Sequence, residues 1–433
     1  MKPYERYKPS GIEWIGGIPE HWKIIRLKYL SKIENGSTPN TGVVEYWNGE
    51  IKWATPVDVS NAKNYLISDT GKKITKEGFD SCGTTLVEPS SIILTTRAPI
   101  GNVAMAGDYI CTNQGCKAIH LLKANHTYLF YQLLVSKGVL ESLGSGSTFK
   151  ELSTDALKSF LVCLPSNNEQ PTIADHLDRK TAHLDDLIAK KQKLIDLLNE
   201  EKTAIINQAV TKGLNPNAPM KDSGIPWLGE RPAHWEIKKI KYIANLTLGK
   251  MLTGEDKGGN FLKPYLRAQN ISWFKCDTSD VKEMWFSQSE LIKYRVNLND
   301  LLVSEGGDVG RTCIWMNELD ECYIQNSVHK ITFKKYFNPK YFLYLFYCFG
   351  RKGYFLSIVN QISIGHLTGE KLKEVFTIFP GFDEQTAIVD YLDRKTDQMD
   401  DVISKTHHEI ELLQEYRTAL ISEAVTGKID VRI

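Results

Sequence analysis

The pentapeptide Leu177-Asp178-Arg179-Lys180-Thr181 occurs again 215 residues later as Leu392-Asp393-Arg394-Lys395-Thr396. The match extends without a gap from residues 165–211 to residues 380–426, and about half of the aligned positions are identical. Both copies also contain a Glu-Gln pair, an Asp-Asp pair and a closing Ala-Val-Thr. An internal repeat of this length indicates that the chain is built from two related halves.

A second, shorter repeat precedes the long one in each half. Ser-Gly-Ile-Glu-Trp-Ile-Gly at residues 10–16 and Pro-Glu-His-Trp at residues 19–22 return as Ser-Gly-Ile-Pro-Trp-Leu-Gly at residues 223–229 and Pro-Ala-His-Trp at residues 232–235. The proline and glycine density predicts extended connectors rather than helices. The tryptophans predict packing of each connector against a neighbouring surface.

Each half therefore has the same order of parts: a connector, a long domain and a helix. The predicted boundaries are residues 1–165 for the first connector and domain, 166–213 for the first helix, 214–380 for the second connector and domain, and 381–433 for the second helix. Beyond this plan the two domains share little sequence. We interpret this pattern as a fixed framework whose two domains perform the same task on different targets.

The two long domains have the pattern of α/β folds, in which short β-branched and aromatic runs are separated by turn residues. Strands are predicted at residues 90–96, 118–122, 300–303 and 329–333. Helices are predicted at residues 128–139 and 339–354, and loops at residues 144–148 and 362–367. We therefore expect an α+β chain with two α/β domains, two long helices and a pseudo-two-fold internal repeat.

Each helical repeat carries an apolar seam with alternating spacings of three and four. The apolar seam positions are Ile188, Ile195, Leu198 and Ile205 in the first helix, and Ile403, Ile410, Leu413 and Leu420 in the second. Lys191, Lys202 and Arg417 also occupy seam positions, which makes an ideal coiled coil unfavourable. The shared pattern favours pairing of the two helices as an antiparallel coiled coil, which would separate the two domains. The alternative is that each helix packs only on its own domain.

Charge is distributed unevenly along the chain, although the formal net charge is only +1. Residues 22–165 have 15 basic and 12 acidic side chains, and residues 235–380 have 20 and 15. Residues 166–213 have 7 basic and 8 acidic side chains, and residues 381–433 have 6 and 12. A positive surplus in the domains is compatible with contact to a polyanion.

The sequence contains none of the motifs that indicate catalysis. No phosphate-binding loop, dinucleotide fingerprint, adenine-methyltransferase motif or His-Glu-x-x-His pattern occurs. The pairs Asp185-Asp186 and Asp400-Asp401 resemble paired carboxylates, but adjacent residues on a helix point about 100° apart. A solvated or partner-facing helix edge is therefore the better interpretation. We expect the chain not to be an enzyme.

The eight cysteines are scattered without a Cys-x2-Cys pair, so neither a zinc site nor a redox motif is indicated. Free thiols are expected in a reducing cytoplasm. No run of 18 apolar residues occurs, so no membrane span is expected.

The domains carry polar loops with interspersed arginines. Arg pairs with guanine edges, Asn and Gln pair with adenine edges, and Ser, Thr and Lys reach phosphates. Ordinary turn chemistry is the alternative for any one of these residues. The predicted DNA-contacting residues are Thr96, Arg97, Asn113, Gln114, Thr148, Lys150, Arg267, Asn270, Arg311, Gln325, Asn326, His329, Ser363 and His366.

The whole chain resembles the specificity (S) subunit of Type I restriction-modification systems. The motifs that carry the resemblance are Ser-Gly-x-x-Trp-x-Gly with Pro-x-His-Trp before each domain, and Glu-Gln, Leu-Asp-Arg-Lys-Thr and Asp-Asp in each helix. Gly36-Ser37-Thr38-Pro39, Arg97-Ala98-Pro99-Ile100-Gly101 and Asn113-Gln114-Gly115 resemble one subtype of target recognition domain. Leu266-Arg267-Ala268-Gln269-Asn270 resembles a common string in others.

The resemblance implies that each domain reads one half of a split, asymmetric double-stranded DNA sequence. It implies that the helices act as a spacer and dock two modification (M) subunits, for which Asp185, Asp186, Asp400 and Asp401 are our candidate contacts. S-adenosylmethionine would be bound by the M subunits, and ATP and Mg²⁺ by restriction (R) subunits, with no cofactor on this chain. The alternatives are a specificity subunit of a Type IIB-like system and a coiled-coil scaffold without a DNA role.

Overall fold

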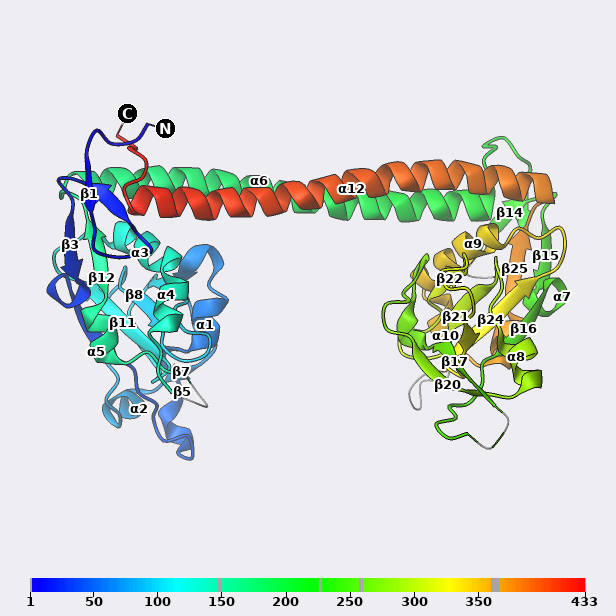
Figure 1. Cartoon of the computed structure of the whole chain (residues 1–433), viewed down its shortest axis with the longest axis horizontal. Helices are drawn as coiled ribbons and strands as arrows, with labels where there is room; N and C mark the ends of the chain where they lie inside the picture. Colours follow the sequence, from blue (N-terminus) through cyan, green and yellow to red (C-terminus); the bar gives the residue numbers. More distant parts are fainter. Residues whose placement is uncertain are drawn as a thin grey trace. The chain divides into compact units, whose positions relative to one another are not determined.

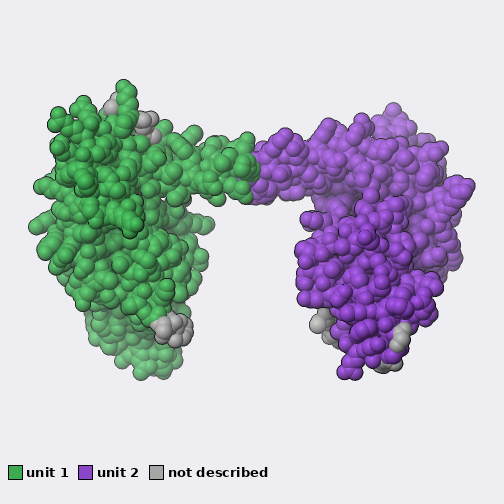
Figure 2. All heavy atoms as spheres, in the orientation of Figure 1, with its two compact units in different colours: residues 1–191, 408–433 green, residues 192–407 purple. Residues whose placement is uncertain are grey.

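The computed structural model describes residues 2–146, 150–225, 228–256, 258, 260–359 and 366–432. The chain forms two compact units (Figure 2). The first contains Met1–Lys191 and His408–Ile433, and the second contains Gln192–His407. Two long helices, α6 (Glu169–Lys212) and α12 (Phe382–Val425), each contribute one part to each unit (Figure 1).

The domain of the first unit is built on a five-stranded sheet with the order β4-β11-β8-β9-β6. β11 (Cys116–Leu121) is antiparallel to β4 (Ser31–Asn35) and to β8 (Ile92–Thr95). All four residues of β8 are buried, because one side of the strand packs on α3 and the other on a second sheet. The other strands of these sheets are β5 (Trp47–Ala54), β6 (Leu66–Ile67), β7 (Lys73–Ile74), β9 (Val103–Ala106) and β10 (Ile110–Thr112).

The domain of the second unit repeats this plan. Its four-stranded sheet has the order β16-β24-β21-β22, and its neighbours are again antiparallel. A three-stranded sheet with the order β20-β17-β23 lies beside it in the core, and β17 pairs with β23 in parallel just as β5 pairs with β10. These strands are β16 (Ala244–Leu248), β17 (Phe261–Leu266), β20 (Lys282–Phe286), β21 (Leu301–Ser304), β22 (Thr312–Ile314), β23 (Tyr323–Ile324) and β24 (Val328–Phe333).

Shorter elements complete both units. In the first they are β1 (Tyr7–Pro9), β2 (Gly17–Pro19), β3 (Lys23–Arg26), α1 (Pro56–Ser60), α2 (Lys76–Asp80), α3 (His126–Val135), α4 (Lys137–Ser142), α5 (Thr154–Ser159) and β12 (Leu161–Leu164). In the second they are β13 (Met220–Asp222), β14 (Glu230–Pro232), β15 (Glu236–Lys239), α7 (Ile240–Ile243), β18 (Ile271–Ser272), β19 (Lys275–Cys276), α8 (Gln288–Tyr294), α9 (Pro339–Arg351), α10 (Tyr354–Ser357), α11 (Gly369–Glu374) and β25 (Phe376–Phe379).

The four predicted strands are confirmed as β8, β11, β21 and β24. The two predicted domain helices are each interrupted. The first divides into α3 and α4 at Ser136, and the second ends at Arg351 before α10 begins. Gly353, at φ +70°, turns the chain between α9 and α10, a left-handed conformation that glycine adopts without strain.

The seam prediction is confirmed in both long helices. The eight apolar seam residues and the three charged ones are all buried or half-buried, and Ile195, Ile410 and Leu420 are almost fully buried. Within the first unit the beginning of α6 lies beside the end of α12, and within the second unit the end of α6 lies beside the beginning of α12. The pairing is therefore antiparallel, and the alternative of two helices packed only on their own domains is wrong.

Ion pairs across the helix pair explain how charged residues occupy the seam. Arg417 donates from Nε and Nη2 to the two carboxylate oxygens of Asp185, at 2.9 and 3.2 Å. Lys202 donates to both oxygens of Asp400, at 2.7 and 2.6 Å, and these four residues are equivalent across the repeat. Lys191 pairs with Glu409 at 2.5 Å. Of the four aspartates predicted as M-subunit contacts, Asp185 and Asp400 therefore face the paired helix, where their carboxylates neutralise seam cations.

The repeated pentapeptide joins each domain to its long helix. The helix begins at Glu169, so the pentapeptide lies in its third turn rather than at its head. Leu177 is fully buried, and Asp178 and Thr181 lie 2.8 and 3.0 Å from the hydroxyl of Tyr131 on α3. Tyr344 of α9 makes the equivalent contacts with Asp393 and Thr396, at 2.7 and 3.3 Å.

The other repeated motifs belong to the same junction. His21 lies 2.9 Å from the carboxylate of Glu169, and His234 lies 2.9 Å from that of Glu384. Trp22 and Trp235 confirm the prediction that connector tryptophans pack against a neighbouring surface, since both are buried in the two main cores. Gln170 and Gln385 accept from the backbone N–H groups of Asn125 and Asn338, which precede α3 and α9.

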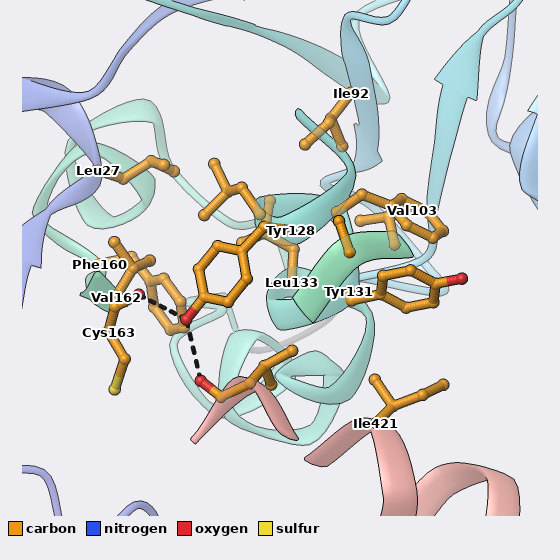
Figure 3. Packing of buried hydrophobic residues seen from close by; sticks show 14 of the residues in the cluster. Leu27, Ile92, Val103, Tyr128, Tyr131, Leu133, Phe160, Val162, Cys163 and Ile421 are labelled. Atoms are coloured by element: carbon orange, nitrogen blue, oxygen red, sulfur yellow. Dashed lines mark hydrogen bonds between the residues drawn. The ribbon is translucent and has the colours of Figure 1, made fainter. Parts of the chain in front are cut away.

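A buried tyrosine closes each junction from within the core. The Tyr128 hydroxyl donates to the backbone carbonyls of Cys163 and Val425, at 3.0 and 3.1 Å (Figure 3). Tyr341 donates to the carbonyls of Ile378 and Val210 at 3.0 and 3.1 Å. Burial raises the pKa of Tyr128 well above its ordinary value, so the hydroxyl remains a donor. Each tyrosine thus ties a domain to the last turn of the long helix from the other repeat.

The Tyr128→Phe variant is expected to lower the free energy of unfolding by about 1–3 kcal/mol, because two buried carbonyls lose their donor. Urea unfolding of the full chain measures this change. Tyr109→Phe, which removes an exposed hydroxyl from the same domain, is the control and should change stability little. Equal losses in both variants would contradict the role assigned to Tyr128.

Candidate nucleic-acid interface

The predicted contact residues of the first domain gather at one end of its main sheet. The pairing of β4 with β11 distinguishes the two ends of the sheet. Ser31 pairs with Leu121 at the end nearer the long helix, where Asn125 contacts Gln170 of α6. Asn35 pairs with Lys117 at the opposite end. Thr95, the last residue of β8, pairs with Cys116 at the same far end. The loops that follow β4 and β8 and precede β11 therefore meet far from the helix junction.

Backbone contacts fix these loops against one another. The N–H of Ser37 donates to Thr112, that of Thr96 donates to Gly115, and that of Leu152 donates to Thr96, at 2.8–2.9 Å. The N–H of Asn113 donates to the carbonyl of Ala54 at 2.9 Å. Arg97, Gln114 and Lys150 are exposed on this group of loops, and Asn113 is half-buried with its amide oxygen bound to the Gly115 N–H.

The second domain gathers its predicted residues at the same end of its sheet. The N–H of Gln325 donates to Leu266, that of Asn326 donates to Lys250, and that of Leu367 donates to Glu305, at 2.8–3.0 Å. Arg311 reaches the carbonyl of Ala268 with Nη2 at 3.4 Å. Arg267, Arg311, Gln325, Asn326 and His366 therefore lie on one connected group of loops.

The two loop groups share one scaffold. A Cβ at Gly36 would lie 1.8 Å from the Asn113 carbonyl oxygen, and a Cβ at Gly249 would lie 2.3 Å from that of Gln325. Both positions require glycine because the two loops cross in direct backbone contact. The loop after β8 closes through Gly101, whose N–H donates to Thr95, and the loop after β21 closes through Gly310 in the same way.

The side chains presented by the shared scaffold differ between the domains. A turn after β5 begins at Thr55, whose N–H donates to the Asp58 side chain, whereas the equivalent turn after β17 begins at Arg267, whose N–H donates to the Asn270 side chain. The residue after the closing glycine is Asn102 in the first domain and Arg311 in the second. Arg97 has no arginine at the corresponding place in the second loop. The two domains thus offer different patterns of hydrogen-bond donors at equivalent positions.

Three predicted contact residues are buried and hold the loops instead. Thr96 is fully enclosed between the backbones of Gly115 and Leu152. The side chain of Asn270 accepts from the Arg267 N–H and donates to the carbonyls of Asp277 and Asp280. His329 lies on β24 with its Nε2 2.7 Å from the Leu367 carbonyl, and burial lowers its pKa. As direct DNA contacts these three predictions are wrong in this structure; Thr148 and Ser363 lie outside the described residues.

The structure adds residues that the sequence interpretation did not include. Thr38 is hydrogen-bonded to Gln114. Lys250, which corresponds to Ser37 of the first domain, lies beside Asn326 in the second domain. Gln269, exposed beside Arg267, is a third. The signal available for the first two was a nearby glycine, since Gly36 and Gly249 keep the 213-residue offset of the connectors.

Among the described residues, no cluster of three or more His, Cys, Asp or Glu side chains could hold a metal ion. The described helices include none with the length and apolar character needed to cross a membrane.

A family model described as Type I restriction modification DNA specificity domain matches residues 19–197 and 232–412. The Type I restriction enzyme MjaIX specificity subunit of Methanocaldococcus jannaschii is 32% identical over 54% of this chain and 54% of that protein, about half its length. The MjaVIII specificity subunit of the same organism is 24% identical over 98% of this chain and 97% of that protein.

Two solved structures share the fold. A chain from a structure of the type I R-M system, concerned with its complex assembly and conformational transition, has a TM-score of 0.73 at 14% identity and covers 95% of this chain and 99% of that chain. The HsdS subunit from Thermoanaerobacter tengcongensis has a TM-score of 0.54 at 15% identity, over 95% of this chain and 98% of that chain.

Proposed function

The chain belongs to the Type I restriction-modification DNA specificity family, and we propose that each of its two domains reads one half of a bipartite, asymmetric double-stranded DNA target. The observation that carries this proposal is the shared loop scaffold with different side chains. A common scaffold would approach DNA in the same way in both half-sites. Different donors at equivalent positions, such as Thr55 against Arg267, would select different bases.

The chain is proposed to be the non-catalytic, sequence-reading member of a larger complex. S-adenosylmethionine would then belong to M subunits, and ATP with Mg²⁺ to R subunits, because the relative that is matched over 97% of its length is named only as a specificity subunit. A cytoplasmic location is supported by the eight cysteines, all of which are free thiols. The long helices would set the spacing of the two half-sites, since apolar seam residues pair the helices and ion pairs of the charged seam residues lock them in each unit.

A repeated surface on the long helices supports docking of two identical partners. Seventeen aligned positions between residues 175 and 204 are exposed in both helices. Nine of them lie within about 40° of one line along the helix, opposite the seam. Seven of those nine are identical in the two repeats, against one of the eight exposed positions elsewhere. We call these seven residues the outer stripe: Asp175, Arg179, Asp186, Lys190, Leu197, Glu200 and Ala204, with Asp390, Arg394, Asp401, Lys405, Leu412, Glu415 and Ala419 in the second copy.

The identity of the outer stripe calls for an external cause. Leu197 and Leu412 are 51% and 49% exposed, so core packing does not hold them fixed. Recent duplication does not explain the stripe either, because the exposed positions around it have diverged. A partner that binds each helix once and in the same way accounts for both facts, and two M subunits are that partner in our proposal. In the second unit a cavity beside Glu200 and Ala204, lined also by Tyr347 and Arg351, extends this surface.

Binding of the S–M complex to duplex DNA tests the main proposal. The target is first identified as the sequence whose adenines are methylated in the host genome. The wild-type complex of this chain with M subunits should bind a duplex with that sequence far more tightly than a scrambled duplex. Failure to do so in a gel shift would favour the scaffold alternative.

The Arg97→Ala variant should lose about 1–3 kcal/mol of discrimination between bases in one half-site only. Equal loss in both half-sites would contradict independent reading by the two domains.

The outer stripe is tested by the stoichiometry of the S–M complex. Leu197→Asp or Leu412→Asp should each remove one M subunit, and the double variant should remove both, because a charge replaces a central apolar contact and weakens binding at least about tenfold. Native mass spectrometry counts the subunits. Leu194→Glu is the control, since Leu194 is also exposed, lies off the stripe and already corresponds to Glu409. Retention of two M subunits in all variants would refute the docking proposal.

A further inference from the structure

Each arginine of the two candidate interfaces is paired with a carboxylate from the same group of loops. Arg97 Nε lies 3.1 Å from Glu151 Oε2, and Arg267 Nη2 lies 3.0 Å from Asp280 Oδ2. Arg311 Nε lies 3.7 Å from Asp308 Oδ2, a looser contact. All three carboxylates are exposed, so each would face a DNA duplex that reached its arginine.

Backbone contacts keep Glu151 beside Arg97. Glu151 exchanges backbone hydrogen bonds with Ser145 in both directions, at 2.9 and 3.1 Å. The next residue, Leu152, donates to the Thr96 carbonyl at 2.9 Å, directly before Arg97. Both partners are about half-exposed, so the ion pair lies at the surface. Its position is set by the fold rather than by the attraction between the two side chains.

Asp280 is held beside Arg267 by the buried Asn270. The Asn270 side chain binds the Arg267 N–H and the Asp280 carbonyl at once, which fixes both backbones. Arg267 Nη2 also donates to the Asp280 carbonyl at 2.7 Å, and Gln269 donates to the carboxylate at 3.2 Å. Hydrogen bonds from Arg267 and Lys282 hold the pKa of Asp280 below its ordinary value, so the group is a carboxylate at neutral pH.

A carboxylate beside an arginine acts differently on phosphates and on base edges. Phosphates attract a free guanidinium at every DNA sequence, and this attraction supplies most non-specific affinity. A fixed carboxylate cancels much of that attraction and repels the phosphate itself. Guanine O6 and N7 are uncharged acceptors, and a guanidinium has five N–H donors, so the arginine can still donate to a base while it keeps its partner.

We propose that Glu151 and Asp280 are specificity-determining residues, which suppress phosphate binding by Arg97 and Arg267 and direct the remaining N–H donors to base edges. This inference rests on the proposed DNA-reading function of the loops. It explains why the domains carry arginines at the interface while their net charge stays low. Selectivity would then come from matched acids as well as from the arginines that touch DNA.

The test compares Glu151→Gln and Asp280→Asn with wild type in the assembled S–M complex. Affinities for the methylated genomic sequence and for a scrambled duplex are measured between 50 and 200 mM salt. For the scrambled duplex, the slope of log affinity against log salt concentration should become more negative by about 0.9 in each variant, which is the effect of one added phosphate contact. The ratio of specific to non-specific affinity at the lowest salt should fall at least about threefold.

Matched controls remove carboxylates from ion pairs outside the interfaces. Glu20→Gln breaks the pair with Arg6 in the first unit, and Glu236→Gln breaks the pair with Lys238 in the second. The inference is overturned if the interface variants change both affinities by the same factor as these controls, or if selectivity rises. Circular dichroism shows whether a variant has lost its fold. If Glu151→Gln has done so, Glu151→Asp, which retains the charge, is measured instead and should keep the selectivity of the wild type. Loss of selectivity in a folded Glu151→Asp variant would also overturn the inference. If wild type itself shows no selectivity, the proposed function fails instead.

Discussion

The structure depends on one interaction that occurs once in each unit: a buried tyrosine hydroxyl shared between a strand of a domain and the last turn of a long helix. Tyr128 and Tyr341 each join three segments that are far apart in sequence. The helix in each contact comes from the opposite repeat, so neither domain is complete with its own helix alone. Antiparallel helix pairing is therefore built into the domain cores, and the repeated motifs of connector and helix all converge on these two junctions.

The sequence predicted the framework well because repetition reports directly on shared geometry. Two aligned seams predicted the antiparallel pair, and β-branched runs predicted the central strands β8, β11, β21 and β24. The helix segments assigned from the repeat, residues 166–213 and 381–433, begin within three residues of α6 and α12. The break at Ser136 was not predictable from the apolar spacing, which continues on both sides of it.

The interface was predicted only as a group of loops. Side-chain type suggested DNA contact for Thr96, Asn270 and His329, yet all three are buried and hold the loops in place. Polar residues of the same kinds serve both purposes, and only tertiary packing distinguishes them. The same limit applies to charge: Glu151 is 54 residues from Arg97, and the seam cations Lys202 and Arg417 find their partners about 200 residues away. Local sequence cannot show such compensation.

The discontinuity of the first unit has a consequence for synthesis of the chain. Its main core includes Leu420, Ile421, Ala424 and Val425 from the end of α12, packed against Tyr128 and Trp22 near the beginning. The second unit is one continuous segment, Gln192–His407. A nascent chain can therefore complete the second domain first, while the first domain, although translated earlier, waits with an open core until residues 408–433 have left the ribosome. The order of folding reverses the order of synthesis.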